Sequence, residues 1–347
     1  MRKTTFVNAL SSFPTLFCLA ALITSPLPCC SQTTVGAAPI NPKDLMIQAA
    51  NMNGLAGSDV KPWHLRATFT LFDGNGNVID HGTYEEFWAS PTKFKSTFAG
   101  LAFNQTNYGS NKGTLRSGTH ELPSELVADL RREFVNPLPE LRSMEYLPFE
   151  LLQREAGAAR LSCVSLRGFN LPAYLFGTSW CLDSDKPVLQ ISISTQESIQ
   201  VIHSKFLNFQ DRVIAGDLQF VRDGKAILTS HLESAEPLPA INDADFNPSA
   251  NATLLPRRVA ISSGVTTGFL LKHDRPAYPR GATESGTVVL RILIDESGRV
   301  IDVHFAGGPL VFKDSALEAA SKWKYKPYLI NGEPVQVDTT ANLVFSR

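Results

Sequence analysis

The chain has 347 residues and a formal net charge of −1 at pH 7, so it has no basic surplus that would indicate a nucleic-acid partner. Its length allows two modest domains, and 43% hydrophobic residues is ordinary for a globular protein. The seven histidines are spread singly, and no zinc-protease motif, nucleophile elbow or glycine-rich phosphate loop occurs. We therefore expect no catalytic residues, no metal site and no cofactor.

The N-terminus predicts export. Two basic residues precede an uncharged stretch whose most apolar part runs from Phe13 to Leu27, and small residues follow. We interpret residues 1–31 as a signal peptide, which places the mature protein in the periplasm or cell envelope. An inner-membrane anchor and lipid attachment at Cys29 or Cys30 are alternatives, although the apolar part is shorter than the roughly 20 residues of a membrane-spanning helix.

Residues 32–59 are predicted to hold a short helix and a connecting segment, and residues 60–235 a β-rich domain. In its first strand, Leu65, Ala67, Phe69 and Leu71 alternate with polar residues, which is the period of a half-buried strand. Further strands follow, separated by polar and glycine-rich turns.

The spacing of apolar residues changes from every second to every fourth residue in the middle of this domain. Leu126, Leu130 and Phe134 lie four residues apart, and Ser124 can cap a helix at its start. A second short helix is expected at residues 148–154. The pattern predicts a curved antiparallel β-sheet domain with inserted helices.

Two cysteines, Cys163 and Cys181, remain in the mature body of the chain. In an oxidising compartment, a disulfide between them is the natural interpretation. The alternative, a thiol pair that binds metal or does redox chemistry, lacks the spacing and the histidines.

The strand, helix, strand order, the position after a signal peptide and the segment Gly82–Pro91 resemble the lipoprotein carriers LolA and LolB. That resemblance implies a half-barrel whose concave face holds acyl chains. Seven aromatic side chains either line such a lipid cavity or form an ordinary core: Phe69, Phe72, Phe87, Trp88, Phe94, Phe98 and Phe103.

Residues 236–272 are predicted to be a linker, because prolines recur in them around a middle rich in Asn, Asp and Ala.

Residues 273–347 predict a small α+β domain of order β-β-α-β. Alternating apolar residues give two strands, 287–295 and 300–305, around a turn at Gly298. A short helix follows, whose apolar stripe ends at Trp323. The last strand, about 335–345, alternates almost perfectly, so the predicted domain is a two-layer sheet with one helix.

This unit resembles the TonB C-terminal domain family. The residues that carry the resemblance occur in the family's order and spacing: Pro276, Tyr278, Pro279, Gly286, Gly298, Trp323, Tyr325, Pro327, Gly332 and Pro334. One departure is Ala306-Gly307-Gly308, where many members have Ser-Ser-Gly, which puts in doubt any partner contact made by that loop.

The resemblance implies partner binding without chemistry. An open sheet edge can receive an extended peptide as an additional strand. In the family, the partner is an N-terminal peptide of an outer-membrane transporter. The candidate edge is the last strand, with Val335, Val337, Thr339, Ala341 and Leu343. The alternative is that this strand only completes the core.

The sequence lacks two parts that energy transduction in this family requires. The first histidine is His64, outside any membrane helix, and the 22 prolines form no periplasm-spanning array. We therefore predict a non-enzymatic envelope protein that binds other envelope proteins, with TonB-dependent outer-membrane transporters as candidates. The alternatives are a periplasmic lipid or lipoprotein carrier that uses the β-rich domain and, as a third class, an enzyme.

Overall fold

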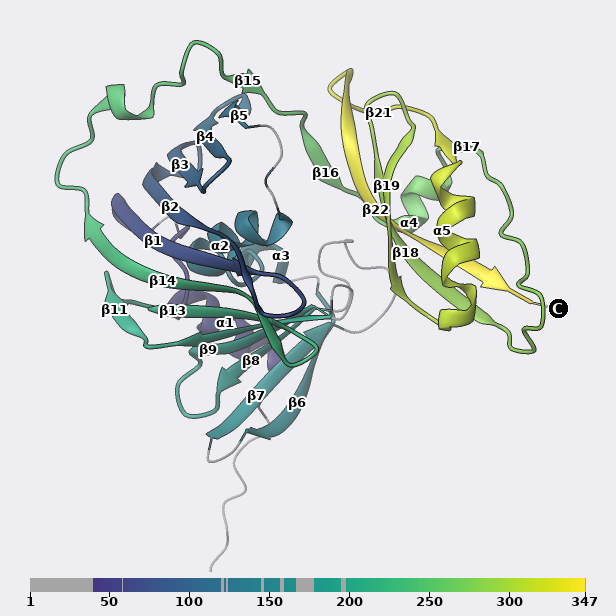
Figure 1. Cartoon of the computed structure of the whole chain (residues 1–347), viewed down its shortest axis with the longest axis horizontal. Coiled ribbons are helices and arrows are strands. Elements are labelled where there is room, and N and C mark those ends of the chain that lie inside the picture. Colours follow the sequence, from purple (N-terminus) through teal and green to yellow (C-terminus); the bar gives the residue numbers. More distant parts are fainter. Residues whose placement is uncertain are drawn as a thin grey trace, which may run out of the picture. The chain divides into compact units, whose positions relative to one another are not determined.

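The computed structural model describes residues 40–57, 59–119, 122, 124–144, 147–156, 159–166, 178–194 and 198–346 (Figure 1). The predicted signal peptide and the first part of the predicted segment 32–59 lie outside these residues. The described part is mostly β-strand, as predicted, with a few short helices. Among the described residues, no helix has the length and apolar character needed to cross a membrane.

The helices are short and separated widely along the chain. They are α1 (Pro42–Met52), α2 (Glu125–Val135), α3 (Leu141–Met144), α4 (Ser263–Thr267) and α5 (Lys313–Ser321), with the 3-10 turns η2 (Asp243–Phe246) and η3 (Leu310–Phe312).

A large antiparallel sheet takes up most of the chain. Its strands, in chain order, are β1 (Trp63–Phe72), β2 (Val78–Ser90), β3 (Lys93–Ala99), β4 (Asn104–Ser110), β5 (Gly113–Gly118), β6 (Phe149–Ala156), β7 (Ala159–Leu166), β8 (Thr178–Asp183), β9 (Leu189–Ser194), β10 (Ile199–Ser204), β13 (Asp217–Arg222), β14 (Lys225–Pro237) and β15 (Thr253–Leu254).

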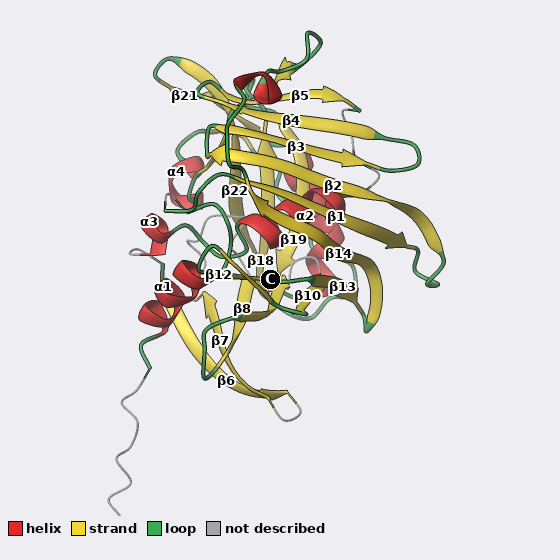
Figure 2. Cartoon of the chain, turned by 90° about the vertical axis from the view of Figure 1, so that its left-hand side faces the viewer, coloured by secondary structure: helices red, strands yellow, loops and turns green. Residues whose placement is uncertain are grey.

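Most neighbours in this sheet are also neighbours in sequence. The 13 strands follow the order β15-β5-β4-β3-β2-β1-β14-β13-β10-β9-β8-β7-β6. Figure 2 shows the part from β5 to β13 with its strands side by side. Strands far apart in sequence meet where β15 pairs with β5 and where β1 pairs with β14, from Trp63 opposite Pro237 to Leu71 opposite Leu228. β11 (Leu207–Phe209) and β12 (Arg212–Ile214) form a separate hairpin.

Helix α2 packs on the inward side of this sheet. Ser124 accepts a hydrogen bond from the Leu126 N–H and so caps the helix, as predicted. Leu130 and Phe134 are buried together with Phe69 and Phe98 of the strands. The predicted spacing of four therefore marks the face that the helix turns to the sheet.

A second cluster lies on the other part of the sheet. Met46 of α1 and Met144 of α3 pack with Trp180, Leu182 and Leu189 of β8 and β9.

The predicted helix at 148–154 is wrong, because this segment forms β6 and pairs with β7. Its apolar residues fit either period, and pairing at the sheet edge decides in favour of the strand.

Cys163 and Cys181 form the predicted disulfide. They stand opposite each other on β7 and β8, and both are buried. The disulfide therefore ties two neighbouring strands across the segment between them.

Reducing this disulfide should lower the free energy of unfolding by about 3 kcal/mol, because the unfolded chain regains the freedom of the closed loop. Urea denaturation with and without dithiothreitol measures the effect. The double variant Cys163→Ser/Cys181→Ser is the control and should show no response to the reductant. Equal urea midpoints for the oxidised and the reduced protein would contradict the prediction.

The C-terminal residues form a second, smaller sheet. It contains β16 (Arg258–Ala260), β18 (Gly286–Ile294), β19 (Val300–Gly307), β21 (Tyr328–Ile330) and β22 (Glu333–Phe345), and β17 (Leu270–Lys272) pairs separately with β20 (Lys324–Tyr325). Helix α5 packs on β18 and β19, with Ala316, Ala320 and Trp323 in the core. The predicted β-β-α-β order is therefore present as β18, β19, α5 and β22.

The segment 236–272, assigned to a linker from its composition, is largely ordered into short elements. β15 pairs with β5, and the Leu255 N–H donates to the Thr114 carbonyl. β16 pairs with β22. The segment thus contributes one short strand to each sheet, although its prolines and polar middle gave no sign of a strand.

Candidate functional site at an edge of the C-terminal sheet

Strand β22 pairs along one side with β18. The register is antiparallel and unbroken, from Gly286 opposite Phe345 to Ile294 opposite Val337. The side chains of the predicted edge residues point into the core: Val335, Val337, Thr339 and Leu343 are buried and Ala341 is half-buried. These side chains hold the strand in place and are not available to a partner.

The other side of β22 is already partly occupied. There β16 runs parallel to it, with Val259 opposite Val337. The Gln336 N–H donates to the Arg257 carbonyl at 2.8 Å, and the Ile261 N–H donates to the Asp338 carbonyl at 3.0 Å. The candidate edge, predicted along the whole last strand, is therefore covered by β16 in the first half of β22.

The second half of β22 has no strand on this side within the described residues. Backbone groups alternate in direction along a strand. Since Gln336 and Asp338 direct their groups away from β18, Thr340, Asn342 and Val344 do the same. Asn342 and Val344 are exposed, Val344 by 71%. Thr340 is buried and α4 packs against β22, so the exposed stretch is limited to Asn342 and Val344.

The glycine and aromatic residues singled out in the sequence hold this sheet together. Gly298 has φ of +85°, and a Cβ there would lie 2.0 Å from the Tyr325 carbonyl oxygen. The Tyr325 N–H donates to the Gly298 carbonyl at 2.7 Å. The Trp323 Nε1 donates to the Asp274 carbonyl at 3.0 Å. Only glycine permits this close approach of the β18–β19 turn to β20.

The remaining residues of that set fix chain entry and turns. The Tyr278 hydroxyl donates to the Glu284 carbonyl, and its ring packs on Phe312. Gly332 follows Asn331 in the tight turn between β21 and β22, where both have positive φ. The prolines lie at breaks: Pro276 and Pro279 before β18, Pro327 between β20 and β21, and Pro334 at the start of β22.

Residues 274–346 match the family model of the Gram-negative bacterial TonB protein C-terminal. A curated relative, Protein TonB of Vibrio cholerae, is 34% identical over 90 residues, which cover 22% of this chain and 36% of that protein. The chain thus spans about a third of the length of that relative. We call residues 274–346 the TonB-type domain.

Solved structures resemble a larger part of the chain at low identity. A LolA superfamily protein of Nitrosomonas europaea is 7% identical with a TM-score of 0.42, covering 60% of this chain and 98% of its own. A DUF1329 family protein of Desulfovibrio piger is 10% identical with a TM-score of 0.41, covering 60% and 98%.

The aromatic residues considered for a lipid cavity lie mainly in the packed core around α2. Phe87 is half-buried and stacks on the His64 ring, and Phe72 is also half-buried. The other five share a cluster with Val127 and Leu130 of α2: Phe69, Trp88, Phe94, Phe98 and Phe103. Side chains of α2 therefore cover this face of the sheet.

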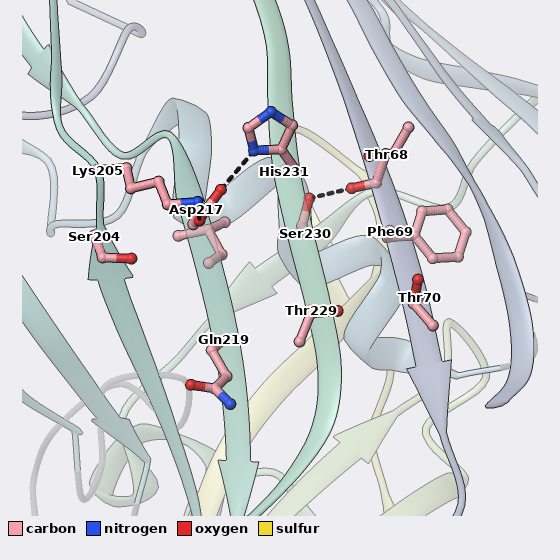
Figure 3. A pocket seen from close by; sticks show the side chains of 11 residues that line it. Thr68, Phe69, Thr70, Ser204, Lys205, Asp217, Gln219, Thr229, Ser230 and His231 are labelled. Atoms are coloured by element: carbon pink, nitrogen blue, oxygen red, sulfur yellow. Dashed lines mark hydrogen bonds and ion pairs between the residues drawn. The ribbon is translucent and has the colours of Figure 1, made fainter. Parts of the chain in front are cut away.

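A polar pocket of about 420 Å³ lies on the large sheet (Figure 3). It joins Thr68 on β1, His231 on β14 and Gln219 on β13 with Lys205 after β10. Lys205 Nζ donates to Asp217 at 2.7 Å, and Asp217 also pairs with His231. Burial raises the pKa of Asp217, but these two hydrogen bonds outweigh it, so the pKa is lowered.

This pocket does not have the geometry of a serine hydrolase. The Ser230 hydroxyl donates to the Thr68 carbonyl at 2.7 Å, while His231 pairs with Asp217 (Figure 3). In a catalytic triad the hydroxyl would bond to the histidine. The sequence did not predict this cluster, because its strands are up to about 160 residues apart in the chain. Its residues also occupy polar strand positions of a kind found in any half-buried strand.

Sequence reasoning also missed a buried polar group beneath α2. Glu133 Oε2 accepts from the Ser192 hydroxyl at 3.0 Å and lies 3.1 Å from His203 Nε2. Burial raises the pKa of Glu133, against bonds from Arg132 and Ser192 that favour the carboxylate. Burial lowers the pKa of His203 to about 3. Within the described residues, no group of three or more His, Cys, Asp or Glu side chains could hold a metal ion.

Proposed function

We propose that this protein is a non-enzymatic component of the Gram-negative cell envelope, whose TonB-type domain binds an extended peptide as an additional strand on β22. Envelope proteins are the proposed partners, with TonB-dependent outer-membrane transporters as the first candidates. One observation carries the proposal: β22 already holds a strand, β16, on the side opposite β18. Further along the same strand, Asn342 and Val344 are exposed.

Strand addition also agrees with the chemistry of this edge. Main-chain N–H and C=O groups supply the affinity when a peptide extends a sheet. The buried side chains of Val337 and Leu343 keep β22 extended, so its backbone is already in the conformation that a partner strand needs.

Asn342→Pro tests the proposal at a single N–H group. Asn342 is exposed and its N–H points away from β18, so proline removes a donor at the edge without removing a bond to β18. We expect affinity for transporter peptides to fall about tenfold or more. The measurement is fluorescence anisotropy with labelled N-terminal peptides of TonB-dependent transporters encoded in the same genome.

Asn342→Ala is the matched control, because it removes the side chain and keeps the N–H. Its affinity should equal that of the wild type. Near-UV circular dichroism of both variants checks that the core around Trp323 is intact. Undiminished binding by folded Asn342→Pro would show that β22 is not the binding edge.

The carrier alternative stays a prediction. It requires lipid to bind where α2 side chains now pack, and mass spectrometry of the protein purified from its native envelope would detect such a lipid.

A further inference from the structure

Strand β16 occupies the binding edge in the manner of a ligand. It is three residues long, runs parallel to β22, and its flanks make the two backbone hydrogen bonds of Arg257 and Ile261 described above. Residues 257, 259 and 261 therefore direct their backbone groups to β22, while Arg258 and Ala260 direct theirs away from it.

The side chains of this segment divide between two faces. Val259 and Ile261 are half-buried against the core of the TonB-type domain, which includes Val337. Arg258 and Ala260 are exposed. The edge thus accepts an extended strand with apolar side chains two positions apart.

The short pairing of β16 and the proline before it make this strand easy to displace. It pairs over only three residues, and Pro256 directly before its flank has no N–H to donate. α4 follows at once and packs on β22, where the Thr266 and Thr339 hydroxyls lie 3.1 Å apart, so displacement of β16 would leave α4 as its anchor. A partner that paired from Gln336 to Val344 would cover the place of β16 together with the exposed stretch beyond it.

We infer that β16 is an intramolecular competitor for the partner peptide, and that the partner is an extended segment resembling it. Such a partner runs parallel to β22, places two apolar residues two positions apart against the core, and displaces β16 to use the edge from Gln336 to Val344. This inference rests on the proposed function, because it takes β22 as the strand to which a partner adds.

The test adds β16 in trans. A labelled peptide with the sequence of residues 256–262 is titrated onto the full chain, and binding is followed by anisotropy. In the wild type the tethered copy outcompetes the free peptide through its high effective concentration. Ile261→Pro removes the donor to the Asp338 carbonyl and loosens the tethered copy, so the peptide should bind about tenfold tighter or more.

Ala260→Pro is the matched control. It places the same proline one position earlier, where the N–H points away from β22, and peptide affinity should equal that of the wild type. Ile261→Ser keeps the N–H and removes the apolar contact, so its peptide affinity should lie between those of the wild type and Ile261→Pro. Hydrogen exchange should show faster exchange of the Gln336 amide in Ile261→Pro and unchanged exchange on β18.

Two outcomes would overturn the inference. Equal peptide affinity in the wild type, Ile261→Pro and Ile261→Ser would show that β16 does not compete. Weaker binding by Ala260→Pro alone would show that the peptide adds to the outer side of β16. Transporter peptides do not enter this test, so strand exchange can hold even if they fail to bind, and can fail even if they bind at Asn342.

Discussion

Replacing Glu86 with glutamine should lower the free energy of unfolding by about 3 kcal/mol or more, because it leaves a largely buried cation without its charge partner. Glu86 is fully buried on β2, where it faces α2. Arg131 of α2 donates to both of its carboxylate oxygens, at 2.8 and 2.9 Å, and the Tyr84 hydroxyl donates at 2.6 Å. The Arg131 guanidinium also lies over the Phe94 ring.

Glu233→Gln is the matched control for this substitution. Glu233 pairs with Arg66 at 3.0 Å, but both side chains are about half exposed, so its loss should cost less than about 1 kcal/mol. Urea denaturation of the two variants measures the difference. Equal losses of unfolding free energy in the two variants would mean that the buried ion pair of Glu86 contributes no more to stability than the exposed pair of Glu233.

A second substitution separates the charge from the packing. Adding Arg131→Met to Glu86→Gln removes the unpaired cation and should recover part of the lost stability. Burial and the negative charge of Glu86 raise the pKa of Tyr84 well above its usual value, so its hydroxyl stays a donor at neutral pH. Glu86 therefore joins β2 to α2 through Arg131, while Tyr84 of the same strand holds its carboxylate in place.

The sequence predicted those helices and strands in which the spacing of apolar residues fits only one type of secondary structure. β18, β19, α5 and β22 follow from alternation, a helical stripe and glycine turns, and residues 274–346 match a known family. α2 follows from Leu126, Leu130 and Phe134 at a spacing of four. Segment 148–154 fits two periods equally, and only its pairing with β7 makes it a strand.

The candidate site was less predictable than the fold. The period of β22 shows which side chains are buried, but it does not show what lies beside the strand. β16 is only three residues long within a proline-containing segment, so neither period nor length marks it as a strand. Its pairing depends on residues about 80 positions later in the chain.

Glu86 shows that one buried polar group could have been found. It lies between Tyr84 and Trp88 at the inward positions of β2, so the alternation places a carboxylate in the core. Its partner Arg131 comes from another element, 45 residues later. The alternation along a strand can therefore predict that a charged residue is buried. Its partner can be identified only from the three-dimensional structure.

The buried pair Glu133 and His203 should make stability depend on pH. Burial lowers the pKa of His203 from 6.5 to about 3, so between these values the unfolded chain binds a proton that the folded chain does not. Stability contributed by neutral His203 is therefore lost as the pH falls through this window, by up to about 1.4 kcal/mol per pH unit.

Glu133 acts in the opposite direction. Burial raises its pKa, so the folded chain holds the proton at higher pH than the unfolded chain, and this contribution to stability is lost as the pH rises through the folded value. Arg132 and Ser192 also bond to this carboxyl and share its environment. The effect of His203 must therefore be isolated by comparison with a variant that cannot titrate.

His203→Gln provides that comparison, because glutamine keeps a polar group beside Glu133 and carries no titrating ring. Urea denaturation at pH 7, 5.5 and 4 should show the wild type losing stability relative to His203→Gln at each step towards acid. The exposed His304, which pairs with Asp302, is the control position, and His304→Gln should parallel the wild type. Parallel curves for the wild type and His203→Gln would mean that His203 takes up a proton in the folded state as readily as in the unfolded chain.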